Sequence, residues 1–168
     1  MPPKSPLKTA TPAGADAALQ LTVAVLATAD AFLRESQRLF RPLGLTGAQY
    51  NVLNVLVDAA GGMSQRELGD RLVVDRSNVT GMLDRMEKAG WVQRQDDPAD
   101  RRVYRVTLTA AGRQLWAQAD EQYRAVVAQV TRGLPAKRIQ ETIAVLQSLE
   151  KAASAWQWPA GANGKEQP

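Results

Sequence analysis

Apolar residues recur at helical spacing along most of this chain, and the pattern changes to a strand-like alternation only once. Within residues 75–89 they fall at Val79, Met82, Leu83 and Met86, the spacing of one buried helical stripe. Residues 91–95 and 103–108 are instead β-rich and alternating, and they frame a polar turn. The pattern predicts a mainly α fold with a small antiparallel β-hairpin.

Three helices are predicted to begin close together ahead of the hairpin. Thr46 with Gln49, and Ser64 with Glu67, have the spacing of a capping box, in which each side chain satisfies an amide group at the start of the helix. Asp75 can cap a third helix. The second helix loses its apolar pattern shortly before this residue, and the gap has the length of a helix-turn-helix connection.

Long helices are predicted on both sides of this compact segment. Residues 16–40 form the first, and residues 110–156 contain two more, with Thr109 as the cap of one and Pro135 in the first turn of the other. The first helix has apolar residues near one side, at Leu19, Val23, Leu26, Ala29, Leu33 and Phe40. Together the three long helices have more apolar surface than a small three-helix core covers, which indicates a partner; packing within one chain is the alternative.

The two ends of the chain differ from the rest in composition. Residues 1–15 are rich in proline and contain two lysines, and residues 159–168 are polar with glycines, so both are expected to be disordered tails. A basic arm that touches DNA is the alternative for the first tail. Residues 16–158 are expected to form a single domain, with a winged helix-turn-helix core at about 46–110.

The third helix of the compact segment has a polar face that suits a DNA-recognition helix. Short polar residues lead at its start, and Arg85 and Lys88 follow where phosphates would run. Small side chains near the start allow the backbone to approach base edges. The alternative is an ordinary solvated amphipathic helix.

The hairpin turn places Arg101 and Arg102 just past its tip. An arginine there could enter a minor groove, whose negative potential favours cations. The alternative is a solvated hairpin whose arginines pair with Asp97 and Asp100. Both can be true, because an aspartate can orient the arginine that enters the groove.

Charge and residue content narrow the class of function. The formal charge of +4 permits nucleic-acid binding, but residues 61–105 contain nine Lys/Arg and eight Asp/Glu, so any positive footprint must come from the placement of charges. The chain has no cysteine and no histidine, which excludes thiol sensing and argues against a zinc site. Without a nucleophile motif or a phosphate loop, no enzyme, metal or cofactor is expected.

The apolar run at residues 19–33 is short for a membrane span and is interrupted by Asp30. No signal peptide with a defensible cleavage site precedes it. We therefore expect a cytoplasmic protein with no membrane partner, associated with the nucleoid when DNA-bound.

The ordered set of these segments resembles the MarR family of bacterial winged helix-turn-helix regulators over residues 45–116. The matching pieces are LTGAQY at 45–50, LDRMEKAGWV at 83–92, DRR at 100–102 and LTAAG at 108–112. The resemblance implies a homodimer with interlocking first and last helices, a triangular frame with two wings, and pseudo-palindromic operator DNA. It also implies Arg102 as the wing-tip residue, supported by Asp100. Gly81 departs from the arginine common in the family.

The leading hypothesis is a dimeric DNA-binding transcription regulator, more specifically a repressor. Its predicted DNA contacts are Ser64, Gln65, Arg76, Ser77, Asn78, Thr80, Gly81, Arg85, Lys88, Asp100, Arg101 and Arg102. The resemblance further implies release by a small aromatic or anionic molecule, for which Phe32, Arg34, Arg38, Tyr50, Asn54 and Trp116 are candidate contacts. The rival is a winged-helix protein-interaction module without a specific DNA site.

Overall fold

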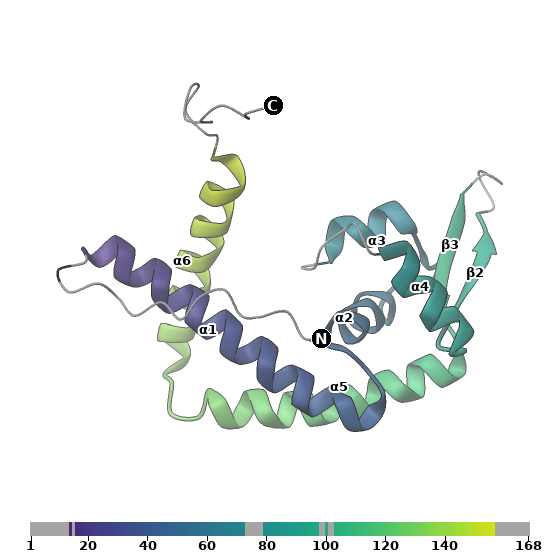
Figure 1. Cartoon of the computed structure of the whole chain (residues 1–168), viewed down its shortest axis with the longest axis horizontal. Coiled ribbons are helices and arrows are strands. Elements are labelled where there is room, and N and C mark those ends of the chain that lie inside the picture. Colours follow the sequence, from purple (N-terminus) through teal and green to yellow (C-terminus); the bar gives the residue numbers. More distant parts are fainter. Residues whose placement is uncertain (1–13, 15, 73–78, 98–99, 101–102, 157–168) are drawn as a thin grey trace, which may run out of the picture. The chain divides into compact units, whose positions relative to one another are not determined.

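The computed structural model describes residues 14, 16–72, 79–97, 100 and 103–156. Its elements in chain order are α1 (Ala17–Phe40), η1 (Arg41–Leu43), α2 (Gly47–Leu56), β1 (Met63–Ser64), α3 (Gln65–Arg71), α4 (Val79–Lys88), β2 (Val92–Asp96), β3 (Tyr104–Leu108), α5 (Ala110–Val130) and α6 (Ala136–Ala155) (Figure 1). The chain divides into two units, residues 1–126 and 127–168. The single domain expected over residues 16–158 stays a prediction.

The helix starts expected from capping residues are confirmed wherever the chain is described. The Ser64 hydroxyl accepts a hydrogen bond from the Glu67 amide, and the Glu67 carboxylate accepts one from the Ser64 amide. Thr46 and Gln49 form the same reciprocal box at α2. Asp75 lies outside the described residues. Local capping chemistry therefore sets where α2 and α3 begin.

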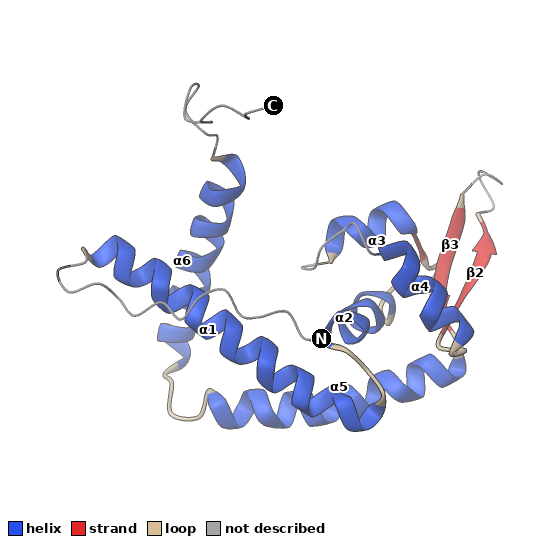
Figure 2. Cartoon of the chain, in the orientation of Figure 1, coloured by secondary structure: helices blue, strands red, loops and turns tan. Residues whose placement is uncertain are grey.

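The sheet has one strand more than the predicted hairpin. Strands β2 and β3 pair antiparallel as expected, from Val92 opposite Leu108 to Asp96 opposite Tyr104. The short β1 adds to the other edge of β3, with Met63 opposite Val106, and gives the order β1-β3-β2 (Figure 2). Because β1 has two residues, it is too short to show an alternating pattern in the sequence.

The winged helix-turn-helix core is formed by apolar side chains from α2, α3, α4 and the sheet. Figure 1 shows α3 and α4 beside the β2–β3 hairpin. The predicted stripe of α4 is buried, and its members, Val79, Met82, Leu83 and Met86, are at most 6% exposed. They pack in one cluster with residues such as Phe40, Leu53, Leu56, Leu68, Val92 and Val106.

The first turn of α5 packs tightly against Trp91, which lies between α4 and β2. The Thr109 hydroxyl accepts from the Gly112 amide at 3.0 Å, so the predicted cap is present. A Cβ atom on Gly112 would lie 1.9 Å from the carbonyl oxygen of Trp91, so only glycine fits here. This contact fixes the start of α5 against the residue that leads into β2.

Helices α1 and α6 bury few side chains. Phe40 is the buried residue of α1, and α6 has none. The remaining apolar stripe of α1 is not part of the core, and Leu33 is 68% exposed. At α6, Pro135 occupies the N-cap and not the first helical turn.

Candidate nucleic-acid interface

The exposed side of α3 and α4 contains most of the described residues that are predicted to contact DNA. The Gln65 side-chain amide donates a hydrogen bond to the Thr80 hydroxyl, which joins the first turn of α3 to α4. Thr80, Arg85 and Lys88 are exposed, whereas Gly81 is partly exposed. The structure therefore brings Gln65, Thr80 and the two cations onto helices that contact each other.

The cap of α3 belongs to the same surface. Hydrogen bonds from the Ser64 amide and then from its hydroxyl lower the pKa of Glu67 below its ordinary value. An ionised carboxylate at a helix N-terminus also suits the helix dipole. The Ser64 hydroxyl thus accepts the hydrogen bond that caps α3, and its predicted contact with DNA stays a prediction.

Several predicted contacts cannot be placed. Arg76, Ser77 and Asn78, together with Arg101 and Arg102, lie outside the described residues. Asp100 is described and exposed, and its amide donates to the Asp97 carboxylate at 3.4 Å. Its predicted support of Arg102 stays a prediction.

Arg94 joins the wing to the recognition helix, and the sequence interpretation missed it. From β2 its guanidinium donates to the carboxylates of Asp84 (2.6 Å) and Glu87, both on α4. These hydrogen bonds, with Asp84 the largest cause, raise the pKa of Arg94 further above its ordinary value. The backbone amide of Arg94 also donates to Glu87 at 3.1 Å.

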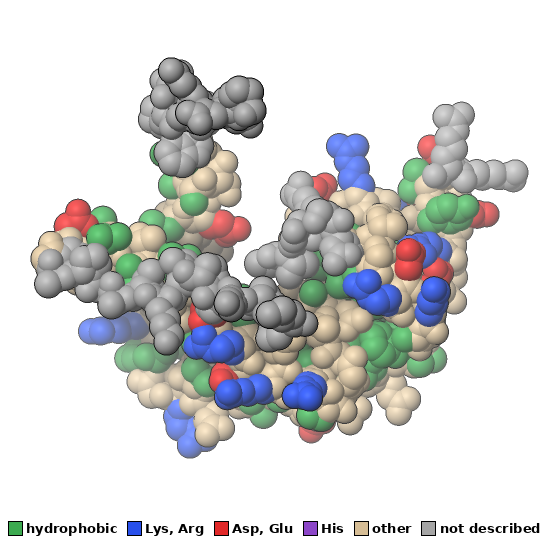
Figure 3. All heavy atoms as spheres, in the orientation of Figure 1, with side chains coloured by type: hydrophobic (Ala, Val, Ile, Leu, Met, Phe, Trp, Pro, Cys, Tyr) green, Lys and Arg blue, Asp and Glu red, His purple; other side chains and the backbone are tan. Residues whose placement is uncertain are grey.

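This pairing changes the charge that α4 presents. Asp84 and Glu87 are each paired with Arg94, whereas Arg85 and Lys88 have no ion-pair partner among the described residues. The part of the molecule formed by α2, α3, α4 and the sheet is called the winged lobe below. Figure 3 shows Lys and Arg side chains interspersed with acidic ones over this lobe, with no single basic block. Acidic and basic residues are nearly balanced over residues 61–105. The unpaired charges on the exposed side of α4 are nevertheless positive.

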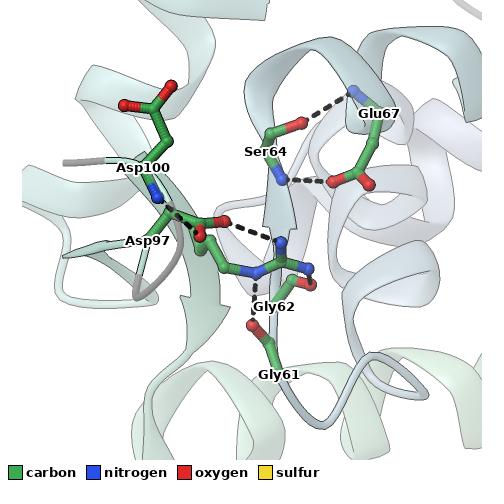
Figure 4. A network of polar contacts seen from close by, with 7 residues as sticks. Gly61, Gly62, Ser64, Glu67, Asp97 and Asp100 are labelled. Carbon is green, nitrogen blue, oxygen red and sulfur yellow. Dashed lines mark hydrogen bonds and ion pairs between the residues drawn. The ribbon is translucent and has the colours of Figure 1, made fainter. Parts of the chain in front are cut away.

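Arg105 makes a second link, on β3 close to the turn of the β2–β3 hairpin. Its guanidinium donates to the Gly61 and Gly62 carbonyl oxygens at 2.8 and 2.7 Å and to the Asp97 carboxylate at 3.0 Å (Figure 4). Gly62 has a φ of +69°, and a Cβ there would lie 2.6 Å from the Val106 carbonyl oxygen. The turn before β1 therefore approaches β3 closely enough for Arg105, on β3, to bind two of its carbonyl oxygens.

The candidate effector residues fall into two groups. Phe32 is 41% exposed, and Arg34 and Arg38 form exposed ion pairs with neighbouring acids of α1. Tyr50, Asn54 and Trp116 lie instead where α2 packs on α5, and the Trp116 indole donates to the Asn54 side chain at 3.2 Å. The structure thus brings three of the candidates together and leaves the others on α1.

A polar chain extends from this packing contact. The Tyr50 hydroxyl donates to Asp120 at 2.9 Å, and Arg124 donates to the same carboxylate at 2.6 Å. Burial first, and the Asp120 hydrogen bond second, raise the pKa of Tyr50 far above its ordinary value. Burial would raise the pKa of Asp120, but the hydrogen bonds from Arg124 and Tyr50 lower it.

Two further aromatic rings pack against the ring of Tyr50. The centroid of the Tyr50 ring lies 4.5 Å from that of Phe40 and 5.2 Å from that of Tyr123. Phe40 and Tyr123 are 5.9 Å apart. The cluster joins the end of α1, α2 and α5, and such stacked pairs add stability beyond burial alone.

Comparison with known proteins agrees with this architecture. A family model described as the MarR family matches residues 43–103. The HTH-type transcriptional regulator TtmR of Methylorubrum extorquens is 41% identical over 101 residues, 60% of this chain and 51% of TtmR. The chain thus spans about half the length of that curated relative.

Two further comparisons cover a larger share of the matched protein. The homoprotocatechuate degradative operon repressor of Escherichia coli is 30% identical over 115 residues, which is 66% of this chain and 77% of the repressor. A crystal structure of a mutant MarR from E. coli complexed with operator DNA is 27% identical, with a TM-score of 0.70, over 80% of this chain and 99% of that one.

Proposed function

We propose, from the premise that this chain belongs to the MarR family of transcriptional regulators, that it is a dimeric repressor that binds a specific, pseudo-palindromic operator. The observation that carries the proposal is the division of α4. Its apolar stripe is buried, and its exposed side presents Thr80 and the unpaired cations Arg85 and Lys88. Such a helix can position itself on phosphates and read base edges.

The repressor role is supported by the printed name of one relative, the homoprotocatechuate degradative operon repressor. DNA binding is supported by the similar MarR structure, which was solved with operator DNA. The predicted contacts outside the described residues, including Ser77, Asn78 and Arg102, complete the proposed interface.

A homodimer is supported by the apolar side chains that α1 and α6 leave exposed, including Leu26, Phe32 and Leu33 on α1 and Ile143, Leu146 and Leu149 on α6. Residues 17–43 would also be long and apolar enough to cross a membrane. The ion pairs Arg34–Asp30 and Arg38–Glu35 favour a protein partner in water, because charged side chains are costly in lipid. A two-fold dimer would set its recognition helices about 34 Å apart.

An effector is proposed on the same basis. A small aromatic or anionic molecule would release DNA by binding the state whose recognition helices are wrongly spaced. The space near Tyr50, Asn54 and Trp116 is the proposed place, because these residues connect α2 of the winged lobe to α5. No cofactor, metal or enzymatic activity is part of the proposal.

Footprinting of the purified protein on fragments of its own genome tests the function. We expect one protected site with two-fold symmetry, and an affinity that falls steeply with salt concentration. Lys88→Ala should weaken binding to specific and non-specific DNA alike and reduce the salt dependence, whereas the control Lys137→Ala, on α6, should change neither.

The same measurement separates the rival function, a winged-helix module that binds proteins. That rival predicts equal affinity for all fragments and no protected site. Arg102→Ala tests the wing separately, because unchanged operator affinity in this variant would contradict the proposed wing-tip contact.

A further inference from the structure

We propose that Arg105 is a positioning residue that fixes the wing relative to the helix-turn-helix, and thereby sets the wing's share of operator binding. The inference rests on the proposed DNA-binding function and deepens it. Arg105 is not among the predicted DNA contacts. It acts through Asp97 and through the turn at Gly61 and Gly62, all of which are described residues.

The geometry of Arg105 is that of a brace between two parts of the lobe. One side of its guanidinium binds the carbonyl oxygens of the turn that leads into β1, directly before the capped start of α3. Another nitrogen binds Asp97, the residue that follows β2 on the way to the wing tip. A planar guanidinium with several fixed donors suits three separate acceptors far better than lysine does.

The acceptors connect this brace to the backbone of the wing. Asp97 is only 12% exposed, and its other carboxylate oxygen accepts from the Asp100 amide. The Asp97 amide donates to the Val103 carbonyl, and the Val103 amide donates to the Asp100 carbonyl, both at 2.9 Å. Movement of Asp97 would therefore disturb its hydrogen bonds to Asp100 and Val103, at the start of the wing turn.

The hydrogen bonds of Arg105 also connect the two surfaces that are proposed to contact DNA together, the wing and the exposed side of α3 and α4. Ser64 lies opposite Arg105 in the β1–β3 register, and Ser64 caps α3. The wing leaves the sheet at Asp97. A wing tied to this point keeps a constant distance from α3 and α4, so its reach to an adjacent minor groove is set before DNA binds.

The first test is hydrogen exchange in the free protein. Arg105→Met removes all three hydrogen bonds while keeping an unbranched side chain, and it should speed exchange at the amides of Asp97, Asp100 and Val103. The matched control is Arg113→Met, because the Arg113 guanidinium also donates to a backbone carbonyl, that of Val57, but away from the wing. Unchanged exchange in Arg105→Met would overturn the inference whatever the protein binds.

The second test is hydroxyl-radical footprinting with affinity measurement. Arg105→Met should weaken operator binding about tenfold, as expected for one lost contact per half-site. It should lose protection at the flanking minor grooves and keep it in the central major grooves. Added to Arg102→Ala, it should weaken binding less than about twofold further, because both act on the same contact. Arg105→Lys should recover part of the loss.

The outcomes are distinguishable. A uniform loss of protection at all grooves, or additive effects of Arg105→Met and Arg102→Ala, would show a general structural role and overturn the inference. If the wild-type protein protects no site, the proposed function fails and this inference falls with it. If wild-type protein protects a site and Arg105→Met protects the same grooves, the inference alone fails.

Discussion

Leu53 in α2 and Leu33 in α1 are the same residue type in two helices of one chain, yet Leu53 is fully buried and Leu33 is 68% exposed. The difference extends to their surroundings. The winged lobe encloses its apolar residues within one cluster, whereas α1 buries Phe40 and α6 buries no residue. The lobe thus buries its apolar side chains in a shared core that includes Phe40 of α1, whereas the outer helices leave most of theirs exposed, where the proposed dimer would cover them.

The largest effect is expected from breaking the core of the lobe. Leu53→Ala should lower the free energy of unfolding by about 2–5 kcal/mol, because it leaves a cavity among fully buried side chains. The control Leu33→Ala should cost well under 1 kcal/mol in the isolated monomer. Urea unfolding at a concentration where the protein is monomeric measures both, and equal losses would contradict the division between lobe and outer helix.

The second largest effect is expected at the proposed dimer interface on α6. Leu146→Glu should raise the dissociation constant of the dimer at least about 100-fold, because two-fold symmetry buries the unpaired charge twice. Ser148→Glu is the matched control, because Ser148 comes two residues after Leu146 and therefore lies about 200° further round the helix. Sedimentation equilibrium measures the constants. A monomeric wild-type protein, or equal constants for the two variants, would refute the proposed interface on α6.

The smallest effect is expected at Tyr50, where α2 of the winged lobe contacts α5. Its pKa is raised in the folded protein, so the folded state keeps this proton where the unfolded chain loses it, and stability should fall as pH rises above about 10. Tyr50→Phe should remove this alkaline loss and cost about 1 kcal/mol at neutral pH through the lost hydrogen bond to Asp120.

Unfolding measured from pH 8 to 11 tests this. The control Tyr104→Phe, at a position 56% exposed, should keep the wild-type pH profile. A Tyr50→Phe profile that matches the wild type would contradict the assignment. At acid pH the effect of Asp120 has the opposite sign, because the pKa of Asp120 is lowered in the folded protein. Its contribution to stability is present above the ordinary pKa of an aspartate and is lost as the pH falls through the lowered pKa.

The parts of the site that could be predicted depend on neighbours in the sequence. The capping boxes of α2 and α3 join residues three apart, and the buried stripe of α4 follows helical periodicity. The parts that were missed join distant segments. Arg105 binds carbonyl oxygens 43 and 44 residues away, and Tyr50 binds a carboxylate 70 residues away. No local pattern marks such partners.

The sequence by itself determined the helix starts, the β-hairpin, the recognition-helix stripe and the resemblance to the family, because these depend on residue type at fixed spacing. Only the tertiary structure decided which charges remain unpaired on α4 and which arginines brace the wing. Arg94 and Arg105 look like any other cations in the sequence. The fold sets them against Asp84, Glu87 and Asp97, because packing of β2 on α4 and pairing of β3 with β2 bring those groups within hydrogen-bonding distance.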